Sequence, residues 1–220
     1  MLTKTTTIAL FAIALAATGC TFDQGYDPAG SPQTLESRLG TREALSLDQT
    51  SLVGVGAYDD AGNPLPCLQP SVNGGDAMMR ATPDGVLVVE KMTINLSDVV
   101  VEPGVVYDAP INLTDIQLRL GTQLGLDTTW SDDGLSATGT GHADLLMDWA
   151  VLSNDGKVLP LATQKLRNVE FNVRATLGDD GLIHAEVMSA VDGRLGGITN
   201  HIELSDFSMA VHANSQAYPL

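Results

Sequence analysis

Three histidines stand two positions before a carboxylate, the spacing at which two side chains of one β-strand project to the same side. An imidazole beside a carboxylate could hold a divalent metal ion or transfer a proton. All three pairs fall on the polar side of an alternating segment, where solvated side chains are expected. We therefore predict no metal ligand, no cofactor and no catalytic residue among them. The three pairs are His142 with Asp144, His184 with Glu186, and His201 with Glu203.

Other sequence patterns that carry chemistry are incomplete. The segments "SDDG", "SNDG" and "GDDG" lack the alternating ligands and the distal glutamate of an EF-hand. "GLSAT" at residues 134–138 has threonine where a nucleophile elbow needs its final glycine. The sequence also lacks the glycine-rich patterns that cradle phosphate. The chain is therefore predicted not to be an enzyme, and an enzyme without a recognisable motif is the third functional hypothesis.

Two tryptophans and one cysteine complete the candidates in the body of the chain. Trp130 and Trp149 could stack on a sugar, but both stand in phase with apolar neighbours and are predicted to be buried. Cys67 lies between prolines in "NPLPCLQP". It is predicted to be a buried free thiol, with an intermolecular disulfide as the alternative in an oxidising compartment.

Cys20 ends the leading segment of the chain. A short start with one positive charge, "MLTK", precedes the apolar run of residues 8–17 and the small residues before Cys20. These three parts make a secretory signal, and the run is too short to span a bilayer. A cysteine thiolate is a good nucleophile for accepting a lipid group, and small neighbours leave the backbone open to a protease.

The residues "ATGC", 17–20, resemble the lipobox of bacterial lipoproteins. The resemblance covers residues 1–20 only, and Ala17 stands where leucine is commonest. It implies cleavage between Gly19 and Cys20, a diacylglyceryl thioether on Cys20, and often a further acyl chain on the new amine. Two or more chains anchor a protein stably, which makes the membrane a partner. Thr21, where an aspartate would retain a lipoprotein in the inner membrane, favours the outer membrane, on its periplasmic or surface side.

The composition excludes some partners. The 220 residues carry 11 Lys and Arg against 27 Asp and Glu, a net charge of −16. Such a surface repels nucleic acid and anionic headgroups. The hydrophobic fraction of 44% is too high for a disordered chain.

The chain is predicted to have three parts. We predict a signal peptide over 1–19, the lipidated cysteine with a flexible tether over 20–50, and a single β-rich domain over 51–220. Within the tether, residues 34–45 could form a turn or two of helix.

The domain shows an apolar period of two, which is typical of half-buried β-strands. Residues 169, 171, 173, 175 and 177 are apolar and are predicted to face the core, whereas Glu170, Asn172 and Arg174 should face water. The phase slips at residues 205–206, which predicts a β-bulge. The longest alternation, residues 135–151, carries Gly139 and Gly141 on its apolar face. It indicates one long bent strand, or two strands joined at the glycines, where another layer can approach closely.

Five Asp-Gly pairs separate the alternating segments and favour tight hairpins. We therefore predict an all-β fold with an antiparallel sheet, sandwich or barrel-like, of about nine to eleven strands with little helix. An aliphatic inner face could enclose an apolar or lipid ligand, which is the first functional hypothesis. The alternative is a structural or protein-interaction module of the cell envelope. An apolar cavity of about 300 Å³ or more favours the first hypothesis, and a filled core favours the second.

Overall fold

The computed structural model describes residues 33–59, 61–102, 108–199 and 202–216. The predictions for Gly19, Cys20 and His201 lie outside these residues. The elements are α1 (Leu35–Leu39), β1 (Glu43–Leu47), β2 (Leu52–Asp59), β3 (Val72–Ala81), β4 (Leu87–Leu96), β5 (Val99–Val101), β6 (Ile111–Leu120), β7 (Leu124–Gly125), β8 (Asp127–Trp130), β9 (Ser136–Leu152), β10 (Val158–Pro160), β11 (Gln164–Leu177), β12 (Ile183–Thr199) and β13 (Ile202–Ser215).

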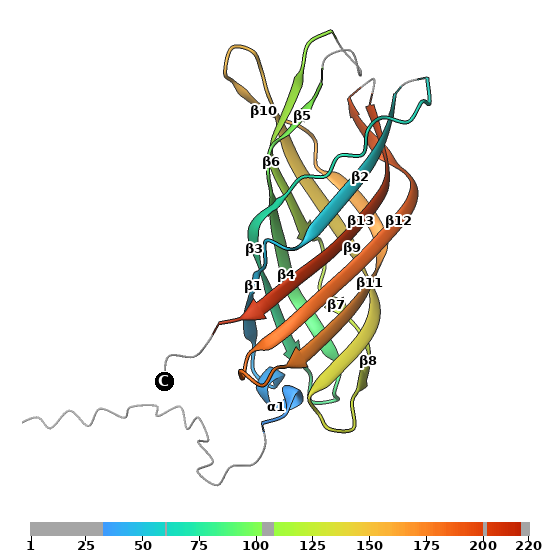
Figure 1. Ribbon diagram of the computed structural model, residues 1–220. Coiled ribbons are helices and arrows are strands. Elements are labelled where there is room, and N and C mark those ends of the chain that lie inside the picture. Colours follow the sequence, from blue (N-terminus) through green and yellow to red (C-terminus); the bar gives the residue numbers. More distant parts are fainter. Residues whose placement is uncertain (1–32, 60, 103–107, 200–201, 217–220) are drawn as a thin grey trace, which may run out of the picture. The chain divides into compact units, whose positions relative to one another are not determined.

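The strands form a closed antiparallel barrel (Figure 1). The ring runs β9-β11-β12-β13-β1-β3-β4-β6, and β6 closes it by pairing with β9, which gives eight positions. Two of the eight positions hold more than one strand. Strands β1 and β2 both pair with β13, at different parts of its length. Strands β7 and β8 occupy the same position as β6, where β7 pairs with β4 and β8 pairs with β9. The predicted fold class is confirmed. The described residues contain 13 strands, above the predicted count, because β5, β7, β8 and β10 have only two to four residues each.

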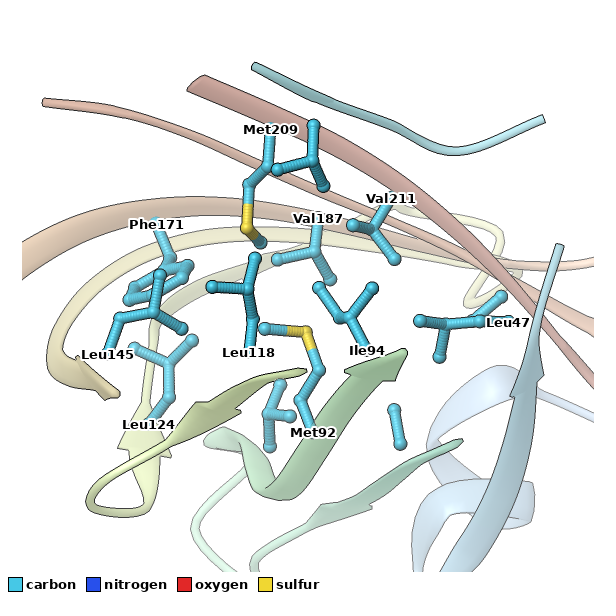
Figure 2. Packing of buried hydrophobic residues seen from close by; sticks show 14 of the residues in the cluster. Leu47, Met92, Ile94, Leu118, Leu124, Leu145, Phe171, Val187, Met209 and Val211 are labelled. Carbon is cyan, nitrogen blue, oxygen red and sulfur yellow. The ribbon is translucent and has the colours of Figure 1, made fainter. Parts of the chain in front are cut away.

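The inside of the barrel is a packed core (Figure 2). On β11 Val169, Phe171, Val173 and Ala175 are buried and Leu177 is half-buried, as the alternation predicts. Their neighbours at 170, 172 and 174 are exposed. An eight-stranded barrel is just wide enough for its side chains to fill. The core clusters apolar residues from every ring strand, so the sheet holds its own interior together without a covering layer.

Glycines allow the long strand to pass close to its neighbour. Strand β9 is continuous over 17 residues. A Cβ on Gly141 would meet the Gly125 carbonyl oxygen, and one on Gly139 would lie 2.8 Å from the Asp127 carbonyl oxygen. Both positions must therefore stay bare where the segment of β7 and β8 comes against β9. This confirms the predicted close approach and favours the single long strand.

The predicted bulge and four of the five predicted turns are present. The pairing of β13 with β2 shifts between Ser205 and Phe207, and Asp206 adopts a left-handed φ of 44°. All five glycines of the Asp-Gly pairs have positive φ, between 69° and 97°. A positive φ costs glycine little, and four of the pairs reverse the chain between two strands. The fifth, Asp192-Gly193, lies inside β12, where the pairing with β13 shifts between Val191 and Arg194. The hairpin predicted there is wrong, because the glycine accommodates a bulge within a continuous strand.

The folded unit begins earlier than residue 51, which corrects the predicted extent of the tether. Helix α1 buries Leu35 and Leu39, and β1 pairs with both β13 and β3 inside the ring. A helical turn within residues 34–45 had been predicted, and Thr34 and Ser37 cap it reciprocally. The strand was missed because its inward positions are Glu43, Leu45 and Leu47, so that a charge interrupts the apolar pattern.

Helix α1 marks one end of the barrel, which we call the α1 end. Leu35 donates its backbone N–H to the Gly134 carbonyl at 2.8 Å, and Arg38 donates to the Gly181 carbonyl at 2.9 Å. The helix thus contacts two of the Asp-Gly turns. The hairpin of β12 and β13 lies at the opposite end, with β5 and β10 (Figure 1).

Candidate functional site

A polar recess of about 500 Å³ lies on the outer wall of the barrel. Strands β11, β12 and β13 form its floor, and the turn between β1 and β2 contributes Asp48 and Thr50. The outer wall recess, as we call it, is lined by Asp48, Thr50, Arg174, Thr176, His184, Ala185, Glu186, His212 and Asn214.

The register of three strands assembles this lining. Outward-facing residues directly opposite one another have Cβ atoms about 4.5–5.5 Å apart. Two such rows cross the recess side by side. The first contains Thr176, His184 and Asn214, and the second contains Arg174, Glu186 and His212.

Both ring nitrogens of His184 face oxygen atoms. Nδ1 lies 2.7 Å from Asn214 Oδ1, to which it donates because an amide oxygen only accepts. Nε2 lies 3.3 Å from Asp180 Oδ1. The backbone N–H of Leu182 lowers the pKa of Asp180 most, and His184 lowers it further, against the opposing effect of burial. The imidazole is therefore held in one orientation beside an ionised carboxylate.

Asp48 contributes an ionised carboxylate to the lining of the recess itself. Thr50 donates its backbone N–H to Asp48 Oδ1 at 2.8 Å. Hydrogen bonds from the backbone and side chain of Thr50 lower the pKa of Asp48, and the nearby His212 lowers it slightly more. Among the lining residues two carboxylates, Asp48 and Glu186, outnumber the one guanidinium, that of Arg174, so the recess has an excess of acidic groups.

In the two histidine–carboxylate pairs that the structure describes in full, the histidine turns to a partner other than the carboxylate two positions along its strand. His142 lies 3.6 Å from Glu170 on the neighbouring strand, while Asp144 binds Lys165 at 2.6 Å. His184 turns to Asn214 and Asp180 rather than to Glu186. Cross-strand neighbours are closer than residues two apart along a strand, so cross-strand contacts prevail. Among the described residues there is no group of three His, Cys, Asp or Glu side chains that could hold a metal ion.

The tryptophans serve the barrel itself. Trp149 is buried in the core, as predicted. Trp130 is half-buried against the core and donates its indole N–H to the Gly85 carbonyl at 2.7 Å. Trp130 therefore links the end of β8 to the turn between β3 and β4.

Cys67 is exposed, which corrects the prediction of a buried thiol. The segment between β2 and β3 runs beside β2, where Leu68 pairs with Val55 and Leu65 donates to the Ala57 carbonyl at 2.8 Å. Leu65 and Leu68 pack against the core, and Cys67 between them faces outward. The prolines determine an extended path, but they do not decide which side chains of that path point inward.

The core leaves little room for an apolar ligand. In the described part of the chain, an apolar crevice beside Met147 and Trp149 measures only about 20 Å³, room for one water molecule. Pockets that enclose an apolar ligand measure about 300–1,000 Å³. By the criterion set from the sequence, the filled core favours the interaction module over the apolar-ligand hypothesis.

Sequence reasoning identified His184 and Glu186 but missed the rest of the recess. The alternation on β13 places His212 and Asn214 on its outward face, which is the one local signal available. Their proximity to Arg174 and Asp48 depends on strand register and on the path of the β1–β2 turn. Neither can be read from any single segment.

Comparisons with known proteins leave the family open. No family model matches the chain, and no curated protein matches it in sequence. One similar solved structure is that of Ail, the attachment invasion locus protein of Yersinia pestis, in complex with the heparin analogue sucrose octasulfate. The identity is 8% and the TM-score 0.45, over 79% of this chain and 97% of that one. In the part of the chain that the structure describes, no helix has the length and apolar character needed to cross a bilayer.

Proposed function

We propose that the protein is a lipid-anchored, non-enzymatic protein of the bacterial cell envelope that contacts a partner through its outer wall. The observation that carries this proposal is the division of the barrel into a filled apolar interior and a polar exterior with a recess of about 500 Å³. A packed interior leaves the outer surface as the place where a partner can bind. The barrel then serves as a rigid support for surface residues.

The charged side chains of the outer wall support attachment to the membrane through a separate anchor. Charged side chains project outward from β4, β6 and β11, among them Lys91, Arg119 and Arg174. A barrel that spans a bilayer carries an apolar outer band, and a cation at the bilayer midplane costs about 2–4 kcal/mol. The lipobox-like segment before Cys20 supplies such an anchor, and Thr21 favours the outer membrane.

The charge of the recess indicates the partner. The carboxylates of Asp48 and Glu186 attract basic groups, and the net charge of −16 opposes nucleic acid and anionic lipid. A basic surface of another envelope protein fits these conditions. Association through such a surface depends on salt, because exposed charges are screened.

The anchor is tested by changing each of the two cysteines in turn. Cys20→Ser removes the thiol that would carry the lipid, so the protein is expected to leave the membrane fraction almost completely. Cys67→Ser is the matched control, because Cys67 is exposed and should not affect attachment. Fractionation of cells with immunoblotting measures both variants. Retention of Cys20→Ser in the membrane at the wild-type level would show that the lipoprotein proposal is wrong.

The contact surface is tested by photo-crosslinking in intact cells. A photoreactive residue at Thr176, inside the recess, is expected to give an adduct with an envelope protein, and Glu186→Lys should reduce its yield about tenfold by reversing a contact charge. Thr93 on β4 is the control position, because β4 lies four strands from β12 around the ring. Adducts of equal yield from Thr176 and Thr93, or a yield unchanged by Glu186→Lys, would contradict the assignment of the recess.

A further inference from the structure

An uncharged part of the outer wall adjoins the outer wall recess. On β12 and β13 the buried residues Val187 and Met209 point into the core (Figure 2), so the residues after them, Met188 and Ala210, face outward. Met188 pairs with Ala210, and Ala210 pairs with Leu52 at the start of β2. Three neighbouring strands thus carry apolar side chains in one outward row. We call Leu52, Met188 and Ala210 the apolar row.

The two long side chains of the apolar row are open to solvent. Leu52 is 70% exposed and Met188 is 43% exposed. The next outward row along the same three strands is small and uncharged, and it consists of Gly54, Ala190 and Ser208. Scattered apolar residues are normal on a protein surface, but apolar residues that gather beside polar ones are typical of a contact surface.

The apolar row borders the two carboxylates of the recess. Met188 stands two residues after Glu186 on β12, and Leu52 follows the turn that carries Asp48. Arg174 lies on β11, on the other side of Glu186 from β13. A strand rises about 3.3 Å per residue, so side chains two residues apart are separated by about 7 Å. The wall therefore offers an acidic contact and an apolar contact about 7 Å apart.

This arrangement defines the groups that a partner must present. Glu186 and Asp48 attract a lysine or arginine side chain. Ala210 is short and lies between Met188 and Leu52, which leaves room for an apolar side chain of the partner against it. Residues two positions apart in an extended segment project to one side at about the same spacing of 7 Å. An extended segment laid along β12 can therefore make both contacts.

Two other occupants of this surface fit less well. The carboxylates beside the apolar row repel the headgroups of an anionic bilayer. A second copy of the chain also carries a net charge of −16, which opposes self-association. A basic segment with an apolar residue meets neither obstacle.

We propose that the outer wall binds an extended segment of an envelope protein in which a basic residue and an apolar residue stand two positions apart. The basic residue lies over the carboxylates of the recess, and the apolar residue lies over the apolar row. This inference rests on the function proposed above, and it adds the apolar half of the contact and the spacing of the two residues.

The test uses the purified full chain in detergent at low salt, with NMR detection of the backbone amides. The probes are three synthetic threonine-rich peptides that carry two test residues two positions apart: lysine and leucine, lysine and serine, or glutamate and leucine. The lysine–leucine peptide is expected to shift the amide signals of Glu186, Ala210 and Leu52. The lysine–serine peptide should bind about tenfold more weakly, the lower end for losing the burial of a leucine side chain, and should leave the signals of Ala210 and Leu52 in place. The glutamate–leucine peptide should not bind, because the recess repels it.

A double-mutant cycle assigns this difference to the apolar row. Met188→Thr removes the exposed apolar side chain but keeps a residue suited to a strand. It should weaken binding of the lysine–leucine peptide about tenfold and leave binding of the lysine–serine peptide unchanged, which also shows that the variant is folded. Val100→Thr is the matched control, because Val100 is 53% exposed on β5, away from the recess, and it should change the binding of neither peptide.

The outcomes separate this inference from the function on which it rests. The inference is overturned if the wild type binds the lysine–leucine and lysine–serine peptides equally, or if Met188→Thr weakens both alike. Shifts at Glu186 with both lysine peptides would then still support an acidic contact surface. Equal binding of the glutamate–leucine and lysine–leucine peptides would contradict the basic partner, and with it both proposals. If no peptide binds, this inference is wrong, while photo-crosslinking from Thr176 still decides the proposed function.

Discussion

Replacing Phe171 with alanine is expected to lower the free energy of unfolding by about 3–5 kcal/mol, the usual cost of cutting a buried aromatic side chain to a methyl group. Phe171 is 0% exposed and lies in the core with Leu145 (Figure 2). It pairs across the sheet with Gly141, which has no side chain to fill the space left behind. A side chain that lined an open groove would cost less than about 1 kcal/mol, because no packed void would form.

Arg174→Ala is the control for Phe171, on the outward face of the same strand. Its loss is expected to cost under about 0.5 kcal/mol, as for most surface substitutions. Urea denaturation of both variants, with equal m-values, measures the difference. If Arg174→Ala were the more damaging change, the assignment of the two faces of β11 would be inverted, since a shift of one residue exchanges the entire set.

Features set by neighbouring residues could be predicted from the sequence. The slip at Ser205 and Asp206 produced the bulge, and the Asp-Gly pairs produced glycines with positive φ. Gly139 and Gly141 marked a close approach of another segment. In each case the local residue types restrict the backbone directly, through steric freedom or through the two-residue period of a strand.

Features that depend on distant segments could not be predicted. Closure of the ring requires β6 to pair with β9, and no residue type specifies that partner. Strand β1 was assigned to the tether because Glu43 occupies an inward position and breaks the apolar alternation. The outer wall recess was missed for the same reason as the closure, because its lining comes from three strands and a turn whose register is set by the fold as a whole.

Glu43 carries the second large prediction because it is a charge within the barrel wall. Its carboxylate lies 3.1 Å from Arg38 Nη2, and the two side chains are 4% and 15% exposed. Arg38 also donates to the Gly181 carbonyl, so the pair joins α1 to β1 and to the turn between β11 and β12. Glu43→Ala would remove this carboxylate from beside the Arg38 guanidinium, and it is expected to destabilise the protein by about 3 kcal/mol, the lower end for a broken buried pair.

A double substitution separates two quantities: the stability lost when one partner of the pair is removed, and the stability that the whole ion pair contributes. Arg38→Met with Glu43→Leu should recover most of the loss, because well-packed apolar residues replace buried ion pairs at little or no cost. Asp76→Ala is the matched control: it breaks the exposed Lys91–Asp76 pair, 2.8 Å long, and should cost under about 1 kcal/mol. Chemical denaturation of the single and double variants measures all three. A single Glu43→Ala variant no less stable than Asp76→Ala would mean that water already solvates Arg38, and that this ion pair contributes little to the stability of the α1 end.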